Sequence, residues 1–205
     1  MKKALKIIGI TLLIILALLI AIPFAFQGQI KDMVKRFINE NVNAKVEFSD
    51  VSLSLLSSFP QAHVSVSDLV ITNFEPFKDE TLATAKNISF TMPIKELFKK
   101  AGDDPIIVNS IDVDEALLTL KTNKFGTTNY DIVKEDENET PSSESSSSSF
   151  SFDIENYELN NSAFTYIDEG SNTNLFATEI NHNGKGIFSG EKSELDTNTE
   201  ARISM

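Results

Sequence analysis

The sequence predicts a mainly β protein that begins with a transmembrane helix. Three observations carry this prediction: an uncharged apolar run at residues 7–26, a helical stripe of apolar residues directly after it, and an alternation of apolar and polar residues from residue 42 onward. Apolar residues at every second position are typical of strands with one buried face. The predicted fold is a transmembrane helix and an amphipathic helix, followed by an antiparallel β-sheet with a short helix and a linker.

The apolar run at residues 7–26 is long enough to cross a bilayer. About twenty residues at 1.5 Å each span the roughly 30 Å of hydrocarbon. A cleaved signal peptide is the alternative, because three lysines stand among the first six residues. The run is longer than the apolar region of such peptides, and Phe24 and Phe26 stand where a peptidase requires small side chains. We therefore expect an uncleaved anchor, and the lack of cysteine excludes a lipoprotein signal.

The basic tail at residues 1–6 favours a cytoplasmic N-terminus. Lys31, Lys35 and Arg36 follow the apolar run and weaken the asymmetry of positive charge across it. A short tail is nevertheless retained easily, whereas long domains are translocated largely regardless of their charge. We expect the bulk of the chain in a periplasm-like space.

Residues 27–41 predict an amphipathic helix. The apolar side chains there recur at the spacing of one helical stripe, and charged residues occupy the other face. The stripe leads directly into strands that need covering, so a helix packed on the sheet is favoured. A helix lying on the outer leaflet is the alternative. The stripe consists of Ile30, Met33, Val34, Phe37 and Ile38.

Period-two alternation continues through residues 42–133, with a change of parity at Ser49 and Asp50 that predicts a bulge. A short helix is expected at residues 93–100, with Pro93 in its first turn. Residues 134–149 are too polar and repetitive to bury a face, and predict a disordered linker. Strands resume at residues 150–205, and we expect the chain to be part of a longer protein.

Charge and motifs exclude several classes of function. A net charge of −12 and a pI near 4.6 give no electrostatic footprint for nucleic acid. His63 and His182 have no second ligand at a zinc-type spacing, and no catalytic or nucleotide-binding motif is present. Residues 168–172 predict a hairpin turn rather than a calcium loop. We expect no enzyme, no metal and no cofactor.

Several segments in this order resemble AsmA family proteins, in the form seen in Bacteroidetes-type bacteria. They follow the basic tail and the anchor, and the similarity covers most of the chain. The segments are residues 43–48 (NAKVEF), 51–60 (VSLSLLSSFP), 64–71 (VSVSDLVI), 81–83 (TLA), 88–90 (ISF) and 130–132 (YDI).

The resemblance implies a protein of the bacterial inner membrane whose periplasmic part is a curved, groove-like β-sheet that holds lipid. The family is related to TamB and to the eukaryotic bridge-like lipid-transfer proteins. It implies phospholipid as ligand, a role in outer-membrane assembly, and envelope proteins as possible partners. Acyl chains would lie on the apolar face while head groups stay in solvent.

The groove implied by the resemblance would be lined by the apolar members of the alternating strands. An ordinary closed core would show the same alternation, so the sequence leaves both open. Two other functions also stay open: a membrane-tethered structural or interaction protein, and a secreted β-domain. The candidate lipid-contact residues are Val46, Phe48, Leu53, Leu55, Val64, Val66, Ile88, Phe90, Ile111, Val113, Leu118, Leu120, Phe152, Ile154, Phe164 and Tyr166.

Overall fold

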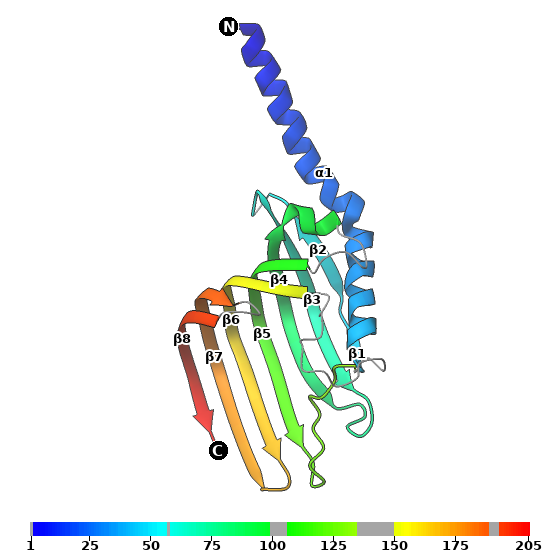
Figure 1. Ribbon diagram of the computed structural model, residues 1–205, viewed down its shortest axis with the longest axis vertical. Helices are drawn as coiled ribbons and strands as arrows, with labels where there is room; N and C mark the ends of the chain where they lie inside the picture. Colours follow the sequence, from blue (N-terminus) through cyan, green and yellow to red (C-terminus); the bar gives the residue numbers. More distant parts are fainter. Residues whose placement is uncertain (1, 57, 99–105, 135–149, 189–192) are drawn as a thin grey trace.

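The computed structural model describes residues 2–56, 58–98, 106–134, 150–188 and 193–205. These residues form one long helix, a short 3-10 helix and one eight-stranded sheet, so the prediction of a mainly β fold is confirmed (Figure 1). The elements are α1 (Lys2–Asn41), β1 (Ala44–Glu47), β2 (Asp50–Ser54), β3 (Gln61–Asn73), β4 (Thr81–Pro93), η1 (Ile94–Phe98), β5 (Ile106–Thr122), β6 (Phe150–Asp168), β7 (Thr173–Phe188) and β8 (Ser193–Ser204).

The two helices predicted at residues 7–26 and 27–41 form one continuous helix, α1. Its first half projects away from the sheet, and its second half runs alongside β1 and β2 (Figure 1). The axis bends between the halves (Figure 1), and the sequence has Pro23, which has no N–H to donate, near the end of the first half. In the part of the chain whose side chains the structure describes, which in α1 omits residues 2–5, 15, 22–24, 26, 33, 36, 37 and 39–41, no helix is both long and apolar enough to cross a membrane.

The second half of α1 covers the sheet, which is the arrangement that the sequence favoured over a helix on the outer leaflet. Ile30 is 4% exposed and lies in the same buried cluster as side chains of β2 and β3. Val34 packs against that cluster, and Gln27 Nε2 donates to the Val51 carbonyl at 3.4 Å. The side chains of Met33 and Phe37 lie outside the described residues.

The strands lie in the order β1-β3-β4-β5-β6-β7-β8, and β2 also pairs with β3. The strands β1 and β2 therefore share one edge of an open sheet, and β8 forms the other. The bulge predicted at Ser49 and Asp50 is the point where the chain passes from one half of β3 to the other. There Ser49 N donates to the Ser67 carbonyl at 3.0 Å.

The sheet is not antiparallel throughout, as the sequence predicted, because β5 and β6 are parallel. Ile106 and Phe150 start side by side, so residues 123–149 must return the chain to the end at which β5 began. Parallel neighbours require such a crossover, which a tight hairpin cannot make. The described part of the crossover reaches α1, where Val133 bridges Val42 and Asn43 N donates to the Ile132 carbonyl at 2.6 Å.

Asn129 fixes the crossover to the end of the sheet. Its side chain is buried, accepts from Lys121 N at 2.7 Å and donates to the Thr119 carbonyl at 2.8 Å. Its carbonyl accepts from Asn73 Nδ2 at 2.5 Å, which links the crossover to the end of β3. Asn129 thus provides hydrogen-bond partners for the end of β5, at Thr119 and Lys121, where β4 no longer pairs with it. No apolar pattern in the sequence indicates this role.

The short helix and the hairpin turn lie near their predicted places. The helix is the 3-10 helix η1, which follows β4 directly. At the turn between β6 and β7, Asp168 Oδ1 accepts from Gly170 N at 2.8 Å and Ser171 N at 3.1 Å. The side chain of Ser171, followed by the backbone N–H groups of Ser171 and Gly170, holds the pKa of the Asp168 carboxyl below its usual value by hydrogen bonding. Of the predicted linker at residues 134–149, residues 135–149 lie outside the described residues.

Four residues with left-handed backbone lie in one row across the sheet. They are Asp68 (φ 51°), Glu115 (φ 49°), Asn161 (φ 44°) and Glu179 (φ 52°). The pairings place Glu115 beside Asn161, and Lys86 of β4 between Asp68 and Glu115. We call these four residues the left-handed row. A left-handed residue breaks the alternation of side chains, which explains why the apolar positions of β5 change from odd to even numbers along the strand.

We predict that position 115, in the left-handed row, tolerates glycine but not valine. Glu115→Val should lower the free energy of unfolding by about 1–2 kcal/mol, because a β-branched residue is strained at positive φ. Glu115→Gly should change it by less than about 1 kcal/mol, because relief of the backbone offsets the lost ion pair with Lys86. Urea unfolding followed by circular dichroism measures both. Glu158→Val on ordinary strand backbone is the control and should cost little. An equal loss at positions 115 and 158 would contradict the prediction.

Candidate functional site

One face of the sheet, which we call the outer face, is polar across its strands. Residues paired across neighbouring strands share a face, so the register defines the rows. One row contains no apolar residue from β2 to β8, and the rows beside it are also polar. It consists of Ser52, Ser65, Ser89, Asp112, Glu158, Asn183 and Asn198.

The opposite face, which we call the inner face, is apolar over most of its area. On one side of the left-handed row, Leu53, Val64, Phe90 and Ile111 are paired in sequence across β2 to β5. On the other side of the left-handed row, a second inner-face row extends to β8. The apolar residues there lie on the same face because the left-handed residues shift the alternation of side chains by one position. That row consists of Val46, Ile71, Ala83, Leu118, Phe164, Ala177 and Ile203.

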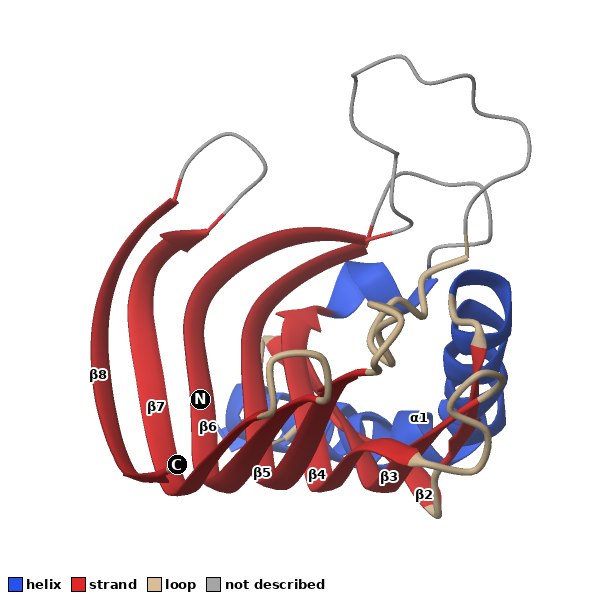
Figure 2. Cartoon of the chain, turned by 90° about the horizontal axis from the view of Figure 1, so that it is seen from below, coloured by secondary structure: helices blue, strands red, loops and turns tan. Residues whose placement is uncertain are grey.

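Part of the inner face is a closed core beneath α1 and η1. In Figure 2 these helices lie over the side of the sheet that contains β2 to β4. Of the candidate lipid-contact residues, Leu53, Leu55, Val64 and Val66 belong to the buried cluster. Three further candidates, Phe48, Phe90 and Ile111, are partly buried and pack against it. The candidate Ile154 is also buried.

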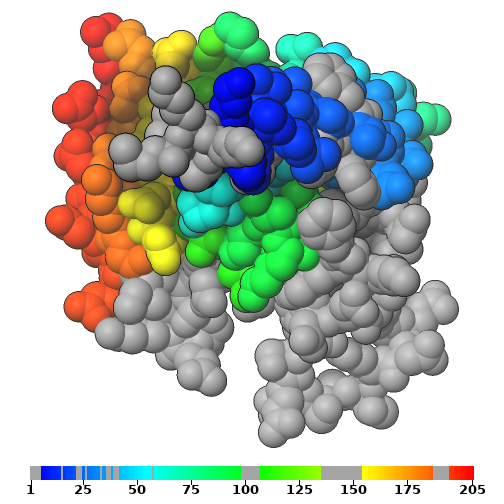
Figure 3. Space-filling view, turned by 90° about the horizontal axis from the view of Figure 1, so that it is seen from above, coloured from blue at the N-terminus to red at the C-terminus, as the bar shows by residue number. Residues whose placement is uncertain are grey.

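The rest of the inner face, over β5 to β8, has no helix upon it among the described residues. Figure 3 shows the blue residues of α1 to one side of the orange and red strands β7 and β8. Leu118 is 37% exposed and Ile203 is 67% exposed, while Leu120, Phe164 and Tyr166 are half-buried. We call this surface the open face.

The remaining candidates divide between the two regions. Ile88 and Val113 pair with each other and are half-buried on the inner face, as is Val46 at the edge. The side chain of Phe152 lies outside the described residues. Sequence reasoning missed Leu175, Ala177 and Ile203, which extend the open face. Their alternation is short and broken by the register shifts of β7, so only the pairing reveals it.

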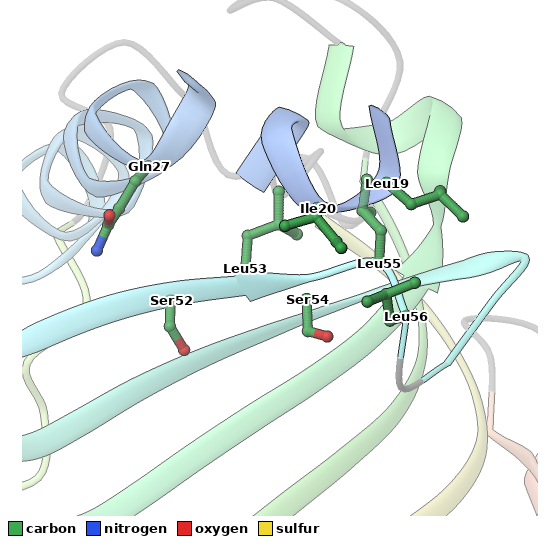
Figure 4. Close-up of a pocket in the computed structure, with 8 residues that line it drawn as sticks. All are labelled: Leu19, Ile20, Gln27, Ser52, Leu53, Ser54, Leu55 and Leu56. Carbon is green, nitrogen blue, oxygen red and sulfur yellow. The ribbon is translucent and has the colours of Figure 1, made fainter. Parts of the chain in front are cut away.

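A cleft of about 330 Å³ lies between α1 and β2 (Figure 4). Leu53 and Leu55 point toward the turn of α1 that carries Leu19 and Ile20. Ser52 and Ser54 point to the opposite side of the strand, and Gln27 lies farther along the helix. Leu56, which is 48% exposed, forms part of the lining. The cleft is continuous with the closed core, because Leu19, Leu53 and Leu55 contribute to both.

The inner face becomes polar at its β7 and β8 side, where His182 and Thr199 are paired. Tyr157 Oη lies 2.8 Å from His182 Nε2, and His182 Nδ1 lies 2.7 Å from Thr199 Oγ1. Gly184 lies directly beneath the Tyr157 ring, where a Cβ would come within 2.3 Å of it. These contacts connect β6, β7 and β8 and explain why the position holds a histidine. Among the described residues, no group of three histidine or acidic side chains could hold a metal ion.

A long helix beside an open amphipathic sheet defines the class of protein: one that presents an apolar sheet face which the helix covers only in part. The chain belongs to the AsmA family, whose family model matches residues 1–202. The resemblance drawn from the sequence is thereby confirmed. No curated protein and no solved structure matches the chain. Membership of this family indicates a function related to envelope assembly or lipid transport.

The outer face predicts a pH-dependent stability that centres on Asp112. Partial burial raises the pKa of its carboxyl from 3.8, and the negative charges of Glu158 and Asp114 raise this pKa further. His63 acts in the opposite direction and lowers it. A carboxyl with a raised pKa in the folded state contributes stability below its unfolded pKa and loses it as pH rises through the folded value. Asp112→Asn should therefore raise Tm at pH 7 by about 1–2 °C.

This gain in Tm should shrink toward zero as the pH falls below about 4, and calorimetry over pH 3–7 measures it. Asp131→Asn, in the exposed part of the crossover, is the control. A gain for Asp112→Asn that is as large at pH 3 as at pH 7 would show that the charge of Asp112 is not its cause.

Proposed function

We propose that this protein binds phospholipid on its open face and conducts it along the sheet, in support of outer-membrane assembly. In this proposal residues 7–26 anchor it in the bacterial inner membrane, residues 1–6 are cytoplasmic, and the sheet is periplasmic. The observation that carries the proposal is the inner-face row from Leu118 through Phe164 to Ile203, which remains apolar from β5 to β8 beyond the cover of α1. Membership of the AsmA family agrees with it.

The physical basis is the hydrophobic effect acting on acyl chains. Each CH₂ group removed from water contributes about 0.8 kcal/mol, so a chain laid along Leu118, Phe164 and Ile203 is held without any specific polar contact. Head groups would stay in solvent at the side of a groove-like sheet. Movement along such a face is passive, because neighbouring rows offer similar apolar surfaces. Direction would have to come from the supply and removal of lipid at the two ends.

The first half of α1 supports the membrane anchor in this proposal. Large apolar side chains surround the helix and are 47–68% exposed, an arrangement that is unfavourable in water and suited to lipid. The helix continues through Ala25 into the segment that packs on the sheet, and Leu19 already touches the core. Cleavage after Ala25 would separate these packed parts. The exposed residues are Ile7, Ile8, Ile10, Leu12, Leu13, Ile14, Leu16, Leu18 and Ile20.

A tethered interaction protein is the second candidate function, and two exposed aromatic side chains favour it. Phe74 is 51% exposed and Phe125 is 93% exposed, both in turns at the end of the sheet away from the N-terminus of α1 (Figure 1). Asn123 Oδ1 accepts from Phe125 N at 2.9 Å and Thr127 N at 3.0 Å, so the turn that carries Phe125 is ordered by its own residues. An ordered, exposed phenylalanine is suited to a pocket on an envelope protein.

We predict that Leu118→Glu lowers the lipid recovered with the detergent-extracted protein by about tenfold, because a carboxylate on the open face opposes acyl chains. Mass spectrometry of the bound lipid measures the loss. Leu117→Glu is a matched control, since Leu117 has a similar exposure (41% against 37%) but faces the outer side. Phe90→Glu is a poorer test, because Phe90 packs against the buried cluster and its loss would also destabilise the fold. Equal lipid recovery from both folded leucine variants would refute a lipid-binding open face.

We predict that residues 7–26 hold the protein in the membrane fraction. The mature chain should retain its N-terminal residues, and alkaline carbonate should not extract it from membranes. Leu13→Arg with Ile14→Arg should move most of the protein to the soluble fraction, because each arginine costs about 2.5–3.5 kcal/mol at the centre of a span. Lys2→Arg with Lys3→Arg is the control that keeps the apolar run intact. A mature chain that begins after Ala25 would support the secreted β-domain instead.

A further inference from the structure

The cleft between α1 and β2 is a second apolar site, separate from the open face. It lies at the turn of α1 where the exposed apolar side chains of the first half end and packing against the sheet begins. Ile20 belongs to both parts, because it is 47% exposed and also lines the cleft. An apolar molecule beside the first half of α1 therefore meets the cleft at two exposed side chains, Ile20 and Leu56.

We propose that this cleft binds one acyl chain of a membrane lipid and is the point at which lipid leaves the bilayer for the protein. This inference rests on the proposed lipid-binding function. The walls that meet the chain are aliphatic: Leu19 and Ile20 from α1, and Leu53, Leu55 and Leu56 from β2 and the turn after it. Gln27, which donates to the Val51 carbonyl, closes the end nearer the middle of the sheet.

The size of the cleft selects a narrow occupant. About 330 Å³ is near the lower limit of ligand sites, which range from about 300 to 1,000 Å³, so it admits one chain rather than a whole two-chain lipid. No cationic side chain lines it to recognise a head group, which leaves shape and apolarity as the basis of binding. The head group would stay outside, beyond the exposed rim at Leu56.

A tryptophan introduced at position 56 tests the proposal, because the chain contains no tryptophan of its own. The full-length Leu56→Trp protein in detergent is titrated with phosphatidylcholine brominated on its acyl chain, which quenches nearby indole fluorescence. Quenching should saturate near one lipid per protein. Adding Ile20→Phe narrows the cleft and should raise the lipid concentration for half-saturation about tenfold, the equivalent of about two lost CH₂ contacts.

Two further probes separate this proposal from the proposed function. Leu118→Trp reports on the open face, and Phe125→Trp reports on lipid that meets the protein at random, since Phe125 is 93% exposed at the far end. Quenching at position 118 alone would overturn the cleft as a site while the lipid-binding function stands. Quenching at position 56 that does not saturate, or that Ile20→Phe leaves unchanged, would assign it to the detergent micelle and overturn the proposal. If quenching at positions 56 and 118 is no stronger than quenching at position 125, both the cleft proposal and the proposed lipid-binding function are overturned.

Discussion

The structure depends on keeping its apolar side chains on one face of a sheet whose long strands do not alternate regularly. Strands of 13–19 residues cross the sheet from β3 to β6, and each reverses the parity of its apolar positions partway along. In β5, Ile111 and Val113 would lie on the face opposite Leu118 and Leu120 if the backbone alternated strictly. The left-handed backbone of Glu115 corrects this by one residue. Because β3, β6 and β7 have left-handed residues in the same row, apolar side chains lie on the inner face on both sides of that row.

This arrangement explains how the two alternatives left by the sequence can both occur in one sheet. A closed core and an open groove require the same alternation, and they differ only in what covers it. Here α1 covers the side of the sheet near β2, where Val51 and Val64 are almost fully buried. Over β5 to β8 the row on the other side of the left-handed row carries Leu118 and Ile203, which are exposed. The closed core therefore holds the sheet together, which leaves the open face available for binding.

The sequence predicts the elements of this fold better than their connections. Hydrophobic periodicity identifies the helical stripe at Ile30 and the strands, because periodicity records which side chains are buried. It cannot identify that β5 and β6 are parallel, since that pairing depends on where residues 123–149 return the chain. The role of Asn129 was hidden for the same reason, as its partners Asn73 and Lys121 are brought to it only by tertiary contacts. The sequence shows that the apolar positions of a strand such as β5 change from odd to even numbers. It does not show that a glutamate with positive φ makes this change, because no residue pattern indicates such a backbone.

The register pairs most of the candidate lipid-contact residues on one face, but the alternation in the sequence does not indicate which of them are exposed. Leu53 and Leu118 look equivalent in the sequence, but one lies under α1 and the other is exposed. What separates them is distance from α1, which covers one side of the sheet. Its packed half closes the core together with η1, while its apolar, exposed half ends beside the cleft between α1 and β2. The helix that covers one part of the inner face thus also places exposed apolar side chains beside the edge of that covered part.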